Sequence, residues 1–268
     1  MNFIIKLLVT VFLGLAAVSH ADVITWTGLG DGVSLFQEAN WVVEGGEVAP
    51  DAGTIDPGVP VPHDLVVNIA GTVGGAGGWN GTLDLGGVGT ISVSTAYFRM
   101  SASSVIKDGS ASVDSSSSFG YIRGGLDNAD FVSSWGLNLS GPMHLINGST
   151  LEATWFAGGN GVSSLNGGST LTIREDAPGT FNNNMINFLD LGSKIVYNNL
   201  NRTIAEVESE HLSRFMVNGA EAVVGSNISI YKDGGTGFTT VQVIPEPGTL
   251  VLLVAGCLTL PFIRRRLV

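Results

Sequence analysis

The stretch NGSTLEAT at residues 147–154 returns twice along the chain, as GGSTLTIR at 167–174 and as GSKIVYNN at 192–199. The matching glycines of the three copies, Gly148, Gly168 and Gly192, are 20 and 24 residues apart. A period of this length is what one coil of a β-solenoid needs, with a glycine turning the chain in each coil. We therefore expect the equivalent apolar positions to stack in the core: Leu151, Leu171 and Ile195.

Short runs in which apolar residues alternate with polar ones fill much of the remaining chain. Examples are DVITWTG, DLVVNIAG and NISIYKDG, each bounded by Gly, Asn or Asp. This spacing between turn residues is typical of β-strands, so the expected fold class is all-β, with a β-solenoid favoured. A β-sandwich with Greek-key connections also has short strands at such intervals and stays open as the alternative.

One segment departs from this pattern and predicts a short helix near 203–216. Thr203 and Glu206 have the spacing of a capping box, and Asn218-Gly219 is suited to end the helix. We expect the helix to close one end of the β domain, because open solenoid ends invite aggregation. Four apolar residues fall on one face of this helix: Ile204, Val207, Leu212 and Phe215.

The start of the chain reads as a targeting segment. In residues 1–21, Lys6 precedes an apolar run, and small residues stand at the two positions that a signal peptidase reads. This pattern predicts a secretory signal peptide, with signal peptidase as a partner and cleavage between Ala21 and Asp22. An exported domain then spans 22–243.

The exported part is acidic and has no cysteine. Of the 12 basic residues, Lys6 and three arginines of the tail lie outside 22–247, so 8 basic residues face 23 acidic ones there, a formal charge of −15. Such a domain is repelled by nucleic acid and by anionic lipid, so no nucleic-acid partner is expected. The single cysteine, Cys257, lies in the apolar tail, which excludes a disulfide within the domain.

No constellation in the sequence predicts a reaction. The histidines His63, His144 and His211 have no partners at metal-ligand spacing, and His211 is expected on a solvated helix face. The stretch TGLGDGVS at 27–34 lacks the lysine of a phosphate-binding loop and predicts a tight turn. We therefore predict no catalytic residue, no metal and no cofactor, and a protein that is not an enzyme. A polysaccharide lyase or hydrolase is the weaker alternative, since solenoids host such enzymes.

Tryptophan is the one residue type that suggests a ligand. Exposed indole rings stack on sugar rings, because both present an apolar face with polar edges. Trp26 and Trp41 are expected in the core. Trp79, in the glycine-rich GGAGGWNGT, and Trp155 are the candidates for sugar stacking.

The chain ends in VIPEPGTLVLLVAGCLTLPFIRRRLV, which has three parts in order. The prolines of Pro245-Glu246-Pro247 keep that motif extended, because they cannot enter a helix interior. The uncharged run at 249–263 predicts a short C-terminal membrane helix. The cluster Arg264, Arg265 and Arg266 is expected to stay in the cytoplasm, which places the domain outside.

This tail, at 244–268, resembles the PEP-CTERM sorting signal, whose parts are a Pro-Glu-Pro motif, an apolar helix and a terminal arginine cluster. Pro261 within the helix and Leu267-Val268 after the arginines are the two departures. The resemblance implies a Gram-negative host and, as a partner, an exosortase-type membrane protease that processes the tail. It also implies transient anchoring in the inner membrane, and then the cell surface or an extracellular matrix of biofilm or exopolysaccharide.

The opening of the domain, ITWTGLGDGVSLFQEANW, resembles the start of secreted, repeat-rich bacterial surface proteins, including autotransporter-like β-solenoids. This second resemblance supports an all-β solenoid and implies no catalytic residue. Taken with the tail, it favours a non-catalytic surface or matrix protein. A carbohydrate-binding adhesin module, with extracellular polysaccharide as its partner, is the alternative.

Overall fold

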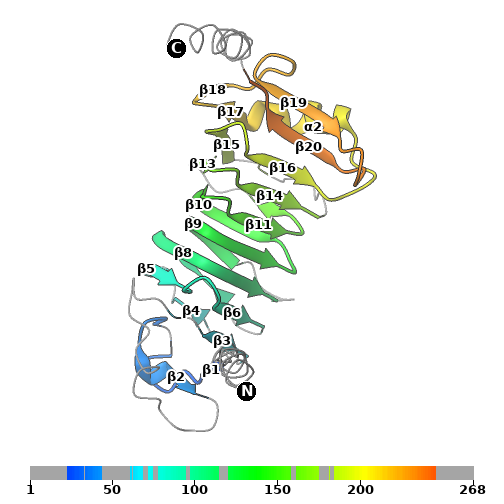
Figure 1. Cartoon of the computed structure of the whole chain (residues 1–268). Coiled ribbons are helices and arrows are strands. Elements are labelled where there is room, and N and C mark those ends of the chain that lie inside the picture. Colours follow the sequence, from blue (N-terminus) through cyan, green and yellow to red (C-terminus); the bar gives the residue numbers. More distant parts are fainter. Residues whose placement is uncertain are drawn as a thin grey trace, which may run out of the picture.

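The computed structural model describes residues 23–32, 34–43, 61, 63–68, 72–74, 78–94, 97–114, 120–157, 161–174, 181 and 184–245. This part of the chain is all-β apart from one short α-helix and short 3-10 turns. Its strands wind into a β-solenoid of about 5 turns (Figure 1). The prediction of a β-solenoid is confirmed, and the β-sandwich alternative is wrong.

The strands that make the coils are mostly short. In chain order they are β3 (Asp64–Val67), β4 (Thr72–Val73), β5 (Trp79–Asp84), β6 (Thr90–Val93), β7 (Tyr97–Phe98), β8 (Met100–Val113), β9 (Gly120–Ser133), β10 (Leu137–Ile146), β11 (Thr150–Ala153), β12 (Phe156–Ala157), β13 (Gly161–Leu165), β14 (Thr170–Ile173), β15 (Asn184–Phe188), β16 (Lys194–Tyr197) and β17 (Phe215–Val217). β8 and β9 have 14 residues each, because both bend round a corner of the coil and pair on two of its sides.

One side of the solenoid, here called the first wall, is a sheet of parallel strands. Its order is β3, β6, the second half of β8, the second half of β9, β11, β14 and β16. Side chains alternate between the two faces of a strand, so every coil sends a residue inward at the same position. The resulting buried column is Leu65, Ile91, Ala111, Phe131, Leu151, Leu171 and Ile195. The predicted stacking of its last three members is confirmed.

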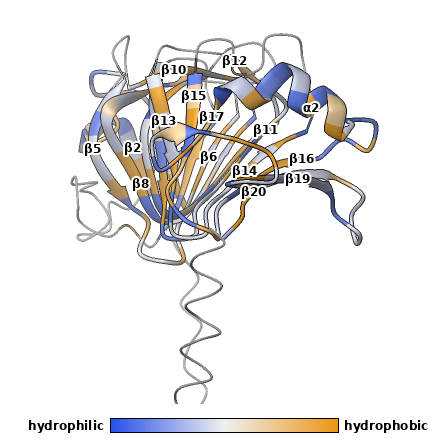
Figure 2. Cartoon of the chain, turned by 90° about the horizontal axis from the view of Figure 1, so that it is seen from above, coloured by the Kyte–Doolittle hydropathy of each residue, from blue (hydrophilic) through white to orange (hydrophobic). Residues whose placement is uncertain are grey.

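A second wall of parallel strands closes the core. It contains β5, the first half of β8, β9, β10, β13, β15 and β17. Figure 2 looks along the stack and shows β13, β15 and β17 on one side of the coil and β14 and β16 on another. The buried column of this wall is Leu83, Ile106, Leu126, Leu145, Leu165, Phe188 and Val217.

The corner between the walls uses residues that tolerate left-handed backbone. Asp108, Asn128 and Asn147 have φ of 49°, 49° and 55°, a region that Asn and Asp enter more readily than most residues. Gly148 and Gly168, with φ of 79° and 78°, confirm the predicted turning role of these glycines. Gly192 does not, because the Asp190 carboxylate holds its turn instead, accepting from the N–H of Gly192 at 3.1 Å.

The N-terminal end is closed by β1 (Val23–Trp26), which pairs in parallel with β3, and by the antiparallel β2 (Trp41–Val43). The expected tight turn lies between them. It is organised around the fully buried Asn40, the last residue of a 3-10 turn at Glu38–Asn40. The Asn40 side-chain oxygen accepts from the N–H of Gly30 at 2.9 Å and of Gly32 at 3.0 Å. Trp26 and Trp41 are buried edge to face, as predicted, with ring centroids 5.0 Å apart.

The C-terminal end carries the helix α2 (Ile204–His211), followed by a 3-10 turn at Leu212–Arg214. Both hydrogen bonds of the predicted capping box between Thr203 and Glu206 are present. The helix ends earlier than predicted, because Phe215 already belongs to β17 and Asn218-Gly219 forms the turn into the next strand. The remaining strands are antiparallel to their neighbours: β18 (Ala220–Glu221), β19 (Ile228–Lys232) and β20 (Thr239–Val243).

Candidate functional site

The predicted sorting motif, Pro245-Glu246-Pro247, begins where the solenoid ends. β20 stops at Val243, the N–H of Ile244 donates to the Asn227 carbonyl at 3.1 Å, and Pro245 is exposed. Glu246, Pro247, the arginines Arg264, Arg265 and Arg266, and the cleavage pair Ala21 and Asp22 lie outside the described residues. The predicted membrane helix also falls there. Within the described ranges, no helix has the length and apolar character to cross a membrane.

Trp79 is not available for sugar stacking, which corrects the prediction from its glycine-rich surroundings. Its side chain is 4 % exposed. The ring packs edge to face against Phe36, with centroids 5.8 Å apart, and lies 6.3 Å from the ring of Phe98. The glycines around it give room for a core ring: a Cβ on Gly74 would lie 3.0 Å from the Trp79 Cδ1 atom.

Trp155 remains partly accessible, and a neighbouring tryptophan is more so. The Trp155 ring is half-buried over Gly136, where an added Cβ would lie 2.0 Å from Cε2 of the ring. Trp135, which the sequence reasoning did not single out, is 45 % exposed. The pairing of Leu137 with Phe156 places Trp155 level with Gly136, so the two tryptophans are offset by one residue in successive coils. Their separation of 20 residues is close to one repeat, and this is the sequence signal that places them in successive coils.

Outward polar side chains join successive coils into ladders. Ser134 donates to Asp114 and Thr150 to Asp130, each at 2.5 Å and across 20 residues. Asn128 donates to Asp108 at 2.8 Å, and this bond and Lys107 lower the pKa of the Asp108 carboxyl. An open hollow of about 340 Å³ lies beside this ladder at the corner of the coil. Its polar lining is therefore largely occupied in holding coils together.

A second hollow, of about 260 Å³, lies on the outer face of the second wall, over Gly124 and Gly125. We call it the glycine hollow. Its lining is mainly apolar, with Val105 on one side, while Asp127 and His144 bring a carboxylate and an imidazole to it. An apolar concave surface with a few polar groups is the usual character of a small-molecule site.

Both polar groups of the glycine hollow are held by the next coil. Asp127 Oδ1 accepts from Asn147 Nδ2 at 2.6 Å. His144 Nδ1 forms a hydrogen bond with Ser164 Oγ at 2.8 Å. Each side chain thus uses one of its two polar atoms in a hydrogen bond to the next coil, and no bond of the other occurs among the described residues.

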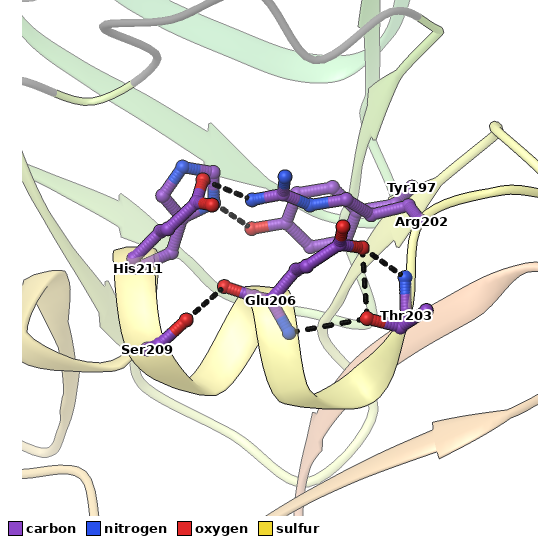
Figure 3. Close-up of polar contacts among 7 residues, drawn as sticks. Tyr197, Arg202, Thr203, Glu206, Ser209 and His211 are labelled. Carbon is purple, nitrogen blue, oxygen red and sulfur yellow. Dashed lines mark hydrogen bonds and ion pairs between the residues drawn. The ribbon is translucent and has the colours of Figure 1, made fainter.

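The third cluster lies under α2 and contains the buried His211, which corrects its predicted place on a solvated helix face (Figure 3). His211 Nδ1 and the Tyr197 hydroxyl form a hydrogen bond of 2.7 Å, and their rings stack. Arg202 lies over the Tyr197 ring and pairs with Glu210 at 2.7 Å. Burial, followed by the positive charge of Arg202, lowers the pKa of His211 to about 4. Because these contacts join α2 to β16, we interpret the cluster as the fastening of the C-terminal cap.

No group of three or more metal-ligating side chains occurs among the described residues. Comparison of the chain with protein-family models, with curated proteins and with solved structures found no match. A functional assignment therefore rests on the geometry described above and on the resemblances in the sequence.

Proposed function

We propose that the chain is a non-catalytic, exported protein of the cell surface or extracellular matrix, sorted and processed through Pro245-Glu246-Pro247. The observation that carries the proposal is the position of Pro245, which is exposed directly after the last strand of the solenoid. The exposure of Pro245 supports access of a membrane protease of the exosortase type to the start of the motif.

The body of the solenoid supports a scaffolding role. The carboxylates of Asp108, Asp114 and Asp130 accept hydrogen bonds from the following coil. These groups stabilise the stack, so their chemistry is already used for structure. A rod of stacked coils with both ends covered is suited to a matrix, because it presents long regular walls while few strand edges remain open.

Replacement of Pro245, Glu246 and Pro247 by alanine tests the sorting proposal in the native host. We expect the wild-type protein to lack both terminal segments by intact mass and to reach the surface or matrix, and the triple variant to remain full-length in the inner membrane. Ser112→Ala, an outward change on the first wall, is the control and should be processed normally. Equal processing of the wild type and the triple variant would overturn the proposal.

A second candidate function, carbohydrate binding, is favoured by the glycine hollow with its apolar floor and its two anchored polar groups. It is compatible with the first, since a matrix protein that binds polysaccharide is retained in the matrix. Calorimetric titration of the full chain in detergent with polysaccharide isolated from the host tests this candidate. Heats no larger than those of dilution would exclude it.

A further inference from the structure

The glycine hollow exists because one position of an outward column has no side chain. Val105, Gly125 and His144 are register partners in three successive coils. A Cβ on Gly125 would lie 3.5 Å from Val105 Cγ2 and 3.6 Å from the His144 carbonyl oxygen, which are ordinary contacts. The fold therefore has room for a side chain at Gly125, and packing does not require the gap.

The neighbouring glycine is different. Gly124 has φ of +110°, and a Cβ there would lie 2.3 Å from the Ser104 carbonyl oxygen. Gly124 is thus needed for the backbone, whereas Gly125 only keeps the surface open. The backbone of the coil therefore depends on Gly124, whereas the shape of the hollow depends on Gly125. A side chain at Gly125 can fill the hollow without disturbing the fold.

The charge of Asp127 is not paired with that of the lysine beside it in the preceding coil. Lys107 is the register partner of Asp127 in the preceding coil. Its ammonium group pairs instead with Asp84 and Asp108, at 3.0 Å each. Among the described residues, Asp127 has no ion pair, and its one hydrogen bond is the bond to Asn147 through Oδ1. The second oxygen, Oδ2, is therefore available to a cationic donor.

From these features the geometry points to a subsite for one amino-sugar ring in the glycine hollow. The apolar face of the ring packs on Val105 and Gly125, its ammonium group donates to Asp127 Oδ2, and a hydroxyl bonds to His144 Nε2. The volume of about 260 Å³ lies below the range of about 300–1,000 Å³ of sites for drug-sized ligands, which suits a single ring. This inference rests on the carbohydrate-binding candidate and names the sugar class.

The test is calorimetric titration of the full chain in detergent with glucosamine, with glucose and with N-acetylglucosamine. We expect glucosamine to bind at least tenfold more tightly than the two uncharged sugars, because a hydrogen bond to a charged group is stronger than a neutral one. Asp127→Asn should remove this preference. Gly125→Val should weaken binding of all three sugars at least tenfold, while its thermal unfolding stays near that of the wild type.

Ser112→Ala, on the first wall, is the matched control and should bind like the wild type. Titration with a glucosamine tetramer shows whether the ligand is a free sugar or part of a polymer. A polymer that extends beyond the hollow should bind more tightly than the single ring. Equal binding of glucosamine and glucose, or binding unchanged in Asp127→Asn and Gly125→Val, would overturn the amino-sugar subsite. Such a failure is separable from failure of the broader candidate, because host polysaccharide would still give heats of binding to the wild type.

Discussion

The middle of the solenoid and its C-terminal end are stabilised in different ways. On the first wall, from Thr90 to Thr170, equivalent positions recur every 20 residues, so one kind of contact is repeated from coil to coil. At the C-terminal end, α2 is held by contacts that occur once, among them the buried Val207 and the cluster around Tyr197 and His211. The comparison teaches that stability in the coils is spread over many equal contacts, whereas in the cap it depends on a few contacts and on their protonation.

The largest expected effect is a cavity in the repeated core. Phe131 is fully buried in the column of the first wall, and its ring lies 6.2 Å from that of Phe98. Phe131→Ala should lower the free energy of unfolding by about 3–5 kcal/mol, measured by urea denaturation of the full chain. Val132→Ala is the control: Val132 is 38 % exposed, so its change should stay within about 0.5 kcal/mol. Similar losses in both variants would contradict the inward and outward assignment.

The next effect is acid sensitivity of the cap. The folded pKa of His211 is about 4, against 6.5 for the free side chain, because burial disfavours the charged ring. The unfolded state therefore binds the proton more readily, and the stabilisation is complete above about pH 6.5 and is lost as the pH falls toward 4. We expect a loss on the order of 2–3 kcal/mol over this interval, measured by urea denaturation from pH 7 to pH 4.

His211→Gln should abolish most of this dependence on pH, whatever its effect on stability at pH 7. His144→Gln changes an exposed histidine of the coils and should leave the dependence unchanged. If the slope against pH in His211→Gln equals that of the wild type, another group is responsible, and the cap is no more sensitive to acid than the coils are.

The two regions also differ in how far the sequence predicts them. The period of the coils is visible because equivalent residues such as Leu151 and Leu171 meet the same environment, so the pattern repeats with the structure. The capping box is visible because it is a local contact between Thr203 and Glu206. The burial of His211 is not local, since it depends on where the helix ends and on which coil residue lies beneath it.

The same distinction applies to the candidate sites. Trp79 and Trp155 both stand near glycines in the sequence, yet one glycine-rich segment encloses its ring in the core while the other leaves its ring partly accessible. The glycine hollow joins Gly125 to His144, which meet only through the pairing of β9 with β10. The sequence alone does not predict this contact, because it does not show the register in which the two strands pair.

A smaller effect is expected from the helix cap. The Glu206 N–H donates to Thr203 Oγ1 at 3.2 Å, and the Thr203 N–H donates to Glu206 Oε2 at 2.7 Å. Thr203→Ala should cost about 1 kcal/mol, because one end of a short helix loses its cap. Hydrogen exchange should show faster exchange of the amides of α2 and unchanged exchange in β11 and β14. Ser209→Ala, on the same helix, is the control. Faster exchange throughout the coils would show that the cap and the coils unfold as one unit.

The smallest effect belongs to a single rung of a ladder. Ser112 Oγ donates to Ser92 Oγ at 3.1 Å on the exposed face of the first wall. Ser112→Ala should cost about 0.5 kcal/mol, and the double variant with Ser92→Ala should cost little more, because the same bond is already lost. A double-mutant cycle by urea denaturation measures this coupling. A coupling above about 1 kcal/mol would mean that stability in the coils is concentrated in particular rungs. In that case the coils would resemble the cap, and the contrast between the two regions would rest on protonation alone.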